Sequence, residues 1–431
     1  MASSGLIEKS NHNRGESMRI KTGLLLGTAL VAMTAGIAHG QDLKAEVMHQ
    51  WTSAGEAAAV KVLADRYTAA GGTWVDAATT GGENLMAVEI ARITGGNPPT
   101  SMQFPLGAEM ISLASQGLLQ DLDSVATEGK WADVLPSIFL DAITYEGHIY
   151  AAPVNNHGQN WLWYNKKVLA DAGAVEPKTW DEFFAATDKL KAAGKIPVAV
   201  GGQAWQLRIV FSGFLASKGG AELYNKVLGE RDEAAIRSPE FKEVVETFQK
   251  LRDYADPGNA NRDWNVATNM VITGEAGFNF MGDWAKGEFS AAGQTAGTDY
   301  GCVLLNDGGA SNFIMSGDIF VFPKHADDSQ LAAQNLLATV MLDPETQALF
   351  NAQKGSVPAR IDVDASTVDA CTSYGLGVLA VPAQQLGSVE FLGTGDFVGA
   401  YGDLVGQLWA DAGMTSDQFV DQLVTIATTI Q

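Results

Sequence analysis

Tryptophan is the residue type in this sequence whose neighbours most clearly suggest chemistry. Four of the ten tryptophans stand beside side chains that donate or accept hydrogen bonds. They occur in Gln50-Trp51-Thr52, Gln203-Ala204-Trp205-Gln206, Asp263-Trp264-Asn265 and Asp283-Trp284. An indole offers a broad apolar face, and a carboxylate or amide beside it offers hydrogen bonds. A pyranose ring has apolar C–H faces and a rim of hydroxyls, so four such cases together favour a carbohydrate-binding cleft. The alternative for each tryptophan is packing in the core.

Motifs for other chemistry are missing from the sequence. Four histidines lie outside the N-terminal segment (His49, His148, His157 and His325), and none stands in HExxH or near a cysteine. There is no GxSxG elbow, no Walker-type loop and no GxGxxG after a strand. We therefore expect no metal, no cofactor and no enzymatic activity. Acidic residues are plentiful, so a glycosidase-like carboxylate pair stays open as an alternative.

The charge balance restricts the partners. Lys and Arg number 28 against 50 Asp and Glu, which gives a formal net charge of −22. Such a chain repels phosphate backbones, and we expect no nucleic-acid partner.

The N-terminal segment predicts export. Arg19 and Lys21 precede an apolar run over residues 23–35, and Ala38-His39-Gly40 offers small residues for cleavage. Residues 1–40 are therefore interpreted as a signal peptide region, with Met18 as the start and cleavage near Gly40; a membrane anchor is the alternative. We expect a periplasmic protein. In that compartment Cys302 and Cys371, the only cysteines, can form one disulfide, although two buried thiols are also compatible with the sequence.

The hydrophobic pattern alternates short strands with amphipathic helices. Strands are predicted at 44–49, 197–200 and 318–322, and helices near 60–67, from 84, from 180, from 239 and from 416. Thr179 with Glu182 forms a predicted capping box. This alternation favours an α/β architecture, and a length of 431 residues suits two lobes.

With these residues in view, the chain resembles the family 1 extracellular solute-binding proteins of ABC sugar transporters, and among them the periplasmic glucose- and mannose-binding proteins. The resemblance covers nearly the whole chain after the signal. The blocks that carry it are HQWTSAGE (49–56), AAPVNNHGQNWLWYN (151–165), GGQAWQ (201–206), GEAGFNFMGDWAKGE (274–288) and KGSVPAR (354–360).

The resemblance implies a periplasmic binding protein fold, with two α/β lobes, three interlobe crossovers and a ligand cleft between the lobes. The crossovers would lie near 153–161, 278–282 and 316–320. Residues 41–153 with 281–316 would form the first lobe, and residues 158–278 with 320–431 the second.

The resemblance also implies the ligand-binding residues: Trp51, Glu56, His157, Trp205, Trp264, Trp284, Asp318 and Lys354. Trp264 and Trp284 would stack on a sugar, Asp318 and Glu56 would accept from its hydroxyls, and Lys354 would donate. His157 would either contact the sugar or order the crossover, and Trp205 could equally belong to the core. The implied function is capture of a monosaccharide or small glycoside by a monomer that delivers it to an inner-membrane ABC permease.

Three departures from the family pattern leave the ligand open. Gln50 stands where glucose-binding relatives have a second tryptophan, residues 103–107 lack their Lys or His, and Glu390-Phe391 replaces a further His. The alternatives are a secreted carbohydrate-active enzyme such as a glycosidase, or a binder of polyols or acidic sugar derivatives.

Overall fold

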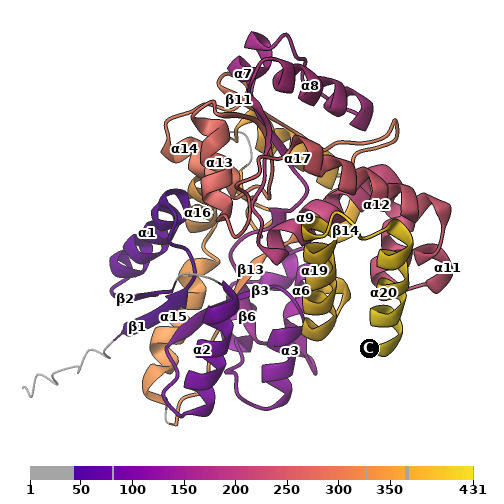
Figure 1. The fold of residues 1–431 in the computed structure, drawn as a ribbon. Helices are drawn as coiled ribbons and strands as arrows, with labels where there is room; N and C mark the ends of the chain where they lie inside the picture. The colour runs from indigo at the N-terminus through magenta and orange to yellow at the C-terminus, as the bar shows by residue number, and fades with distance from the viewer. Residues whose placement is uncertain (1–42, 80–81, 327, 365–367, 431) are drawn as a thin grey trace, which may run out of the picture. The chain divides into compact units, whose positions relative to one another are not determined.

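The computed structural model describes residues 43–79, 82–326, 328–364 and 368–430 (Figure 1). The predicted signal peptide region lies outside the described residues. Two larger sheets organise the described chain, and a small three-stranded sheet lies where the chain passes from one to the other. Within the described ranges, no helix combines the length and apolar character needed to cross a membrane.

The first sheet has five strands. Their order is β2 (Thr73–Ala78), β1 (Lys44–His49), β3 (Ser101–Pro105), β13 (Asp318–Val321) and β6 (Ala151–Pro153). β1 runs parallel to β2 and β3, whereas β13 is antiparallel to β3 and β6. The helices α1 (Ala54–Ala69), α15 (Leu331–Met341) and α16 (Pro344–Lys354) pack on one another, and α1 and α15 also contact strands of this sheet.

The second sheet has four strands, in the order β11 (Tyr300–Val303), β8 (Leu162–Asn165), β10 (Ala276–Phe280) and β9 (Ile196–Ala199). The helices α8 (Trp180–Ala192) and α13 (Trp264–Ile272) contact strands of this sheet. A further group of helices packs side by side: α9 (Ala204–Phe214), α12 (Pro239–Leu251), α19 (Gly395–Ala410) and α20 (Ser416–Thr429) (Figure 1). Phenylalanines 183, 211, 214, 241 and 248 are fully buried in the core on this side.

Local sequence signals explain several of these element starts. Ser53 and Glu56 form a capping box at α1, as Thr179 and Glu182 do at α8 and Thr415 and Gln418 at α20. Ser238 caps α12 ahead of Pro239, whose missing N–H is no loss in the first turn. The capping box at residues 179–182 and the strand at residues 44–49 were predicted, and both are present.

Three passages of the chain between the two large sheets lie together. β7 (His157–Gly158) pairs with β12 (Phe313–Ser316), so Ser316 lies opposite His157, and Val154 N–H donates to the carbonyl of Asp318 at 3.0 Å. Asn156 and Val357 exchange two backbone hydrogen bonds of 2.8 and 3.1 Å. The passages are therefore 154–161, 316–318 and 355–357.

The strand pairing differs from the expected lobe boundaries in two places. The expected crossover at 278–282 covers the last residues of β10 and the two residues after it, and the chain then returns to the same sheet as β11, which pairs with β8. After residue 320 the chain continues into α15 and α16, which pack against α1 of the first sheet. The expected boundaries placed the 300–303 strand in the first lobe and these two helices in the second.

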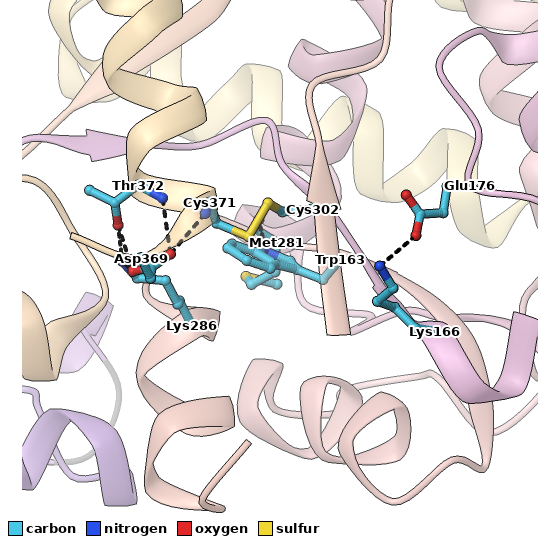
Figure 2. Close-up of a disulfide and its surroundings, with 9 residues drawn as sticks. All are labelled: Trp163, Lys166, Glu176, Met281, Lys286, Cys302, Asp369, Cys371 and Thr372. Carbon is cyan, nitrogen blue, oxygen red and sulfur yellow. Dashed lines mark hydrogen bonds and ion pairs between the residues drawn. A yellow bond between two sulfur atoms is a disulfide. The ribbon is translucent and has the colours of Figure 1, made fainter. Parts of the chain in front are cut away.

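Cys302 and Cys371 form a disulfide that joins β11 to α17 (Ala370–Leu379) (Figure 2). The predicted bridge is thus present. Asp369 caps α17 by accepting from the N–H groups of Cys371 and Thr372 at 2.9 and 3.0 Å. The buried Lys286 donates to the same carboxylate at 2.6 Å, which ties α14 (Ala285–Ala291) to the bridged helix end.

Candidate functional site

Asp318, the first residue of β13, lies at the centre of a buried polar network. Its Oδ1 accepts from Gln103 Nε2 at 3.0 Å and its Oδ2 from Asn155 Nδ2 at 2.8 Å. Its backbone N–H donates to Asn155 Oδ1 at 2.7 Å. The amides of Gln103 on β3 and of Asn155, two residues after β6, therefore hold the carboxylate in one orientation.

The His157 imidazole joins Asp318 to a second carboxylate. Nε2 lies 3.0 Å from Asp318 Oδ2, and Nδ1 bonds Asp283 Oδ1. Burial disfavours a charge on His157, but Asp283 and Asp318 outweigh burial and raise the pKa of the imidazole. Burial likewise opposes ionisation of Asp318, yet His157, Lys354 and Asn155 lower the pKa of that carboxyl to about 2. The network thus favours an imidazolium between two carboxylates.

Lys354, the last residue of α16, supplies a second buried cation. Its Nζ lies 3.2 Å from Oε1 of Glu56, with 3% of the lysine side chain exposed and 12% of the glutamate. The ammonium lies 5.4 Å from the ring centroid of Trp51 and 6.0 Å from that of Trp284. A lysine is stable at this depth because a carboxylate and two indole faces replace part of its hydration.

Trp284 joins the two polar groups. Its indole meets the His157 ring edge to face, with centroids 5.1 Å apart, and lies 6.3 Å from the ring of Trp205. Gly282 makes room for this ring, because a Cβ there would lie 2.2 Å from the indole. The side chain of Trp284 is half-buried, so part of its surface stays accessible beside Asp318 and Lys354.

Trp205 is the second residue of α9, and Trp264 is the first residue of α13. Gln203 links the two helix starts: its Oε1 accepts from Trp205 Nε1 at 2.9 Å and its Nε2 donates to Asp263 Oδ1 at 2.8 Å. Trp264 is half-buried against the core, and among the described residues the ring contacts of Trp284 are with His157 and Trp205. Contacts therefore join seven of the eight expected residues. Trp264 is the exception: it directly follows Asp263, which is linked to Trp205 through Gln203.

The structure adds residues to the predicted set. Asn155 and Asp283 hold His157 and Asp318 in place, and Gln103 binds Asp318. A largely buried ion pair, Arg208 with Glu390, lies next to Gln159, whose Nε2 is 3.5 Å from Glu390 Oε2. Sequence signals existed for three of them, since Asp283 precedes Trp284, and Gln103 and Glu390 lie in segments that depart from the family pattern.

The arrangement suits recognition of a polyhydroxylated ring. Asp318 Oδ1 accepts one hydrogen bond, from Gln103, and Glu56 Oε2 accepts one, from the Ser53 N–H of the capping box, so each of these oxygens keeps one further acceptor position. Lys354 carries three N–H donors, and the half-buried Trp284 supplies an apolar face, whereas Trp51 is 2% exposed and packs against Phe320 and Phe350 in the core. Hydrogen-bonding groups of both kinds thus lie beside aromatic surface, which is the combination a sugar requires.

Comparisons with known proteins identify the family of the chain. Residues 51–348 match the family of bacterial extracellular solute-binding proteins. A probable sugar-binding periplasmic protein of Mesorhizobium japonicum is 41% identical over 411 residues, which cover 93% of this chain and 97% of the relative. The chain therefore belongs to the bacterial extracellular solute-binding proteins, a family of binding proteins rather than enzymes.

Solved structures share the fold. A chitin oligosaccharide binding protein superposes with a TM-score of 0.75 at 20% identity, covering 91% of this chain and 99% of the other. The maltose-bound MalE3 of T. maritima gives a TM-score of 0.76 at 18% identity, covering 89% of this chain and 99% of the other. The two-lobed periplasmic binding protein fold expected from the sequence is thus confirmed.

Proposed function

We propose that the protein is a periplasmic sugar receptor that binds a monosaccharide or small glycoside and delivers it to an inner-membrane ABC permease. The observation that carries the proposal is the group formed by Asp318, Lys354 and Glu56 beside the indoles of Trp51 and Trp284. The names of the relatives, which include sugar-binding periplasmic proteins, support the same ligand class.

The site residues have distinct proposed roles. Trp205, Trp264 and Trp284 supply apolar faces for the sugar ring, and the buried Trp51 supports the Lys354 ammonium. Asp318 and Glu56 accept from hydroxyls, and Lys354 donates. His157 positions Asp318 and does not contact the sugar, because Asp283 and Asp318 occupy both of its ring nitrogens.

We propose lobe boundaries that follow the sheets. The first lobe would comprise residues 43–153 and 318–362, because Ala359, Arg360 and Ile361 hydrogen-bond Gln347, Leu342 and Val134 of that lobe. The second lobe would comprise residues 158–315 and 368–430. The passages 154–157 and 316–317 would then belong to the hinge, and the site residues would come from both lobes. A ligand that contacts both lobes would favour their closure.

The charges near the site favour a neutral ligand over an anionic one. Five carboxylates (Glu56, Asp283, Glu288, Asp318 and Glu390) face three cations (His157, Lys354 and Arg208), and each cation is already paired with a carboxylate. A sugar acid would add another negative charge where every cation is already paired. The free energy of binding would be less favourable, because charge repulsion is stronger where the side chains are shielded from water.

A thermal-shift panel tests the function. Neutral sugars (D-glucose, D-galactose, D-mannose and D-xylose), D-mannitol and D-glucuronate would each be added to the purified protein, followed by calorimetric titration of any hit. A ligand at 100 times its Kd adds about 2.7 kcal/mol of stability. We expect a shift with at least one neutral sugar. Stabilisation by glucuronate alone, or hydrolysis of an added glycoside, would contradict the proposal.

Two parts of the proposal need separate measurements. Light scattering coupled to size exclusion would test whether the protein is a monomer. Delivery predicts that the sugar-loaded protein stimulates ATP hydrolysis by its permease in lipid nanodiscs, and that the sugar-free protein does so less.

A further inference from the structure

The ends of α1 and α14, two helices that connect strands of different sheets, meet beside the site. α1 connects β1 to β2 of the first sheet, whereas α14 connects β10 to β11 of the second. The N-terminal end of α14 contacts the N-terminal end of α1 and the C-terminal end of α16. The three helices are neighbours at the left of Figure 1. This contact therefore joins the two proposed lobes.

Two glycines let these helices approach one another. A Cβ at Gly55 would lie 2.6 Å from the carbonyl carbon of Gly287. A Cβ at Gly287 would lie 2.8 Å from the carbonyl oxygen of Gln353 and 3.0 Å from that of Lys354. Both glycines are helical, and neither has a positive φ. An alanine would fit either backbone and would clash only with the helix from the other sheet.

A polar contact lies at the same place. The backbone N–H of Gly55, in the first turn of α1, donates to Glu288 Oε1 of α14 at 2.9 Å. First-turn N–H groups have no partner within their own helix, and the positive end of the helix dipole favours a carboxylate there. Glu288, on a helix that packs with the second sheet, therefore satisfies an N–H donor of α1, which packs with the first sheet.

We propose that Gly55, Gly287 and Glu288 form a closing contact, made only when the two lobes come together, that stabilises the closed arrangement without any ligand. The closing contact rests on the proposed function only in so far as it uses the lobe boundaries proposed there. Gly55 directly precedes Glu56 in the sequence, and Gly287 packs against the backbone of Lys354. The contact therefore brings Lys354, at the end of α16, toward Trp284, which directly precedes α14. Ligand affinity then depends on this contact although it does not touch the ligand.

The ligand-free protein provides the first test. Gly55→Ala should increase the radius of gyration measured by X-ray scattering, because the methyl group blocks closure. Its free energy of unfolding should change no more than that of Gly399→Ala, a control in α19 where a Cβ meets open space. A radius equal to that of the wild type, or a large loss of stability as in an overpacked core, would overturn the proposal.

Hydrogen exchange tests the polar contact separately. In ligand-free wild type the Gly55 amide should exchange slowly, and in Glu288→Ala it should exchange much faster. The control is Glu240→Gln on α12, an exposed position far along the chain, which should leave exchange at Gly55 unchanged. Equal exchange at Gly55 in the wild type and in Glu288→Ala would contradict the closing contact.

Binding provides the last readout, with the sugar that gives the largest thermal shift as the probe. Glu288→Ala should weaken affinity about tenfold, mostly through faster dissociation, as expected for loss of a hydrogen bond to a charged group. Unchanged affinity would overturn the link to binding. If no sugar binds the wild type, the proposed function fails, while scattering and exchange still decide the closing contact.

Discussion

The imidazole of His157 meets the indole of Trp284 edge to face, with the ring centroids 5.1 Å apart and the planes at 87°. The same imidazole bonds Asp283, the residue directly before Trp284, and Asp318 from the first sheet. One histidine at a chain passage therefore sets the position of both the carboxylate and the aromatic face in the candidate site. Mutations at these residues should separate binding from folding.

Loss of the Asp318 carboxylate should weaken binding more than shrinking the Trp284 ring to phenylalanine. We expect Asp318→Ala to weaken sugar affinity more than Trp284→Phe, because a hydrogen bond to a charged group contributes about 1.5–3 kcal/mol. Stacking adds about 0.5–1.5 kcal/mol beyond area burial, and phenylalanine keeps part of that. Calorimetric titration of each folded variant measures the difference. Trp284→Ala that loses stability but keeps its affinity would show that the ring only packs against the hinge.

Asp318 should also stabilise the fold in a pH-dependent way. Its pKa is lowered from 3.8 to about 2 in the folded protein, so its contribution is present above pH 4 and is lost as the pH falls through about 2. The difference in unfolding free energy between wild type and Asp318→Asn should therefore shrink by about 2 kcal/mol between pH 4 and pH 2. Urea titrations of both proteins measure this. A constant difference over that range would mean that the carboxylate charge does not matter.

Residue type alone was enough to select side chains that the structure brings into contact. The polar neighbours of Trp51, Trp205 and Trp284 indicated a cleft, and contacts link all three to the network that holds Asp318. The α/β fold followed from the alternation of strands and helices, because each pattern has its own period.

The sequence could not reveal which sheet each segment joins. The strand at 300–303 and the helices at 331–354 carry the same local patterns in either lobe, and only their pairing with β8 and packing against α1 assign them. Asn155 was missed for a similar reason. Its role depends on Asp318, 163 positions later, and no local spacing indicates that contact.

The disulfide should stabilise the fold by restricting the unfolded chain. Cys302 and Cys371 are 69 positions apart, and closing a loop of that size contributes about 2–4 kcal/mol. Cys302→Ser with Cys371→Ser should lower the free energy of unfolding by that amount, as measured by urea titration. The wild type under reducing conditions is the matched comparison. Equal stability of the oxidised and reduced wild type would exclude a stabilising role.

Glu89 should make stability fall as the pH rises. It lies on the buried face of α2 (Gly82–Thr94), one turn from Leu85 and one from Ile93, and is 1% exposed. Its Oε1 has no hydrogen-bond partner among the described residues, and burial raises the pKa of this carboxyl to about 8. Between pH 4.5 and 8 the folded protein keeps a proton that the unfolded chain has lost, so the free energy of unfolding decreases through that range.

Replacing Glu89 by glutamine should reduce this dependence. Glu89→Gln keeps the size of the side chain and cannot ionise, so its stability should fall less from pH 5 to pH 8 than that of the wild type, and the remaining fall reflects groups such as His157, whose pKa is also raised. Glu240→Gln, on the exposed face of α12, is the control and should follow the wild type. Urea titrations at pH 5, 6, 7 and 8 measure all three proteins. If Glu89→Gln loses stability with pH as steeply as the wild type, then Glu89 is ionised in the fold and water or an unseen partner must reach its carboxylate.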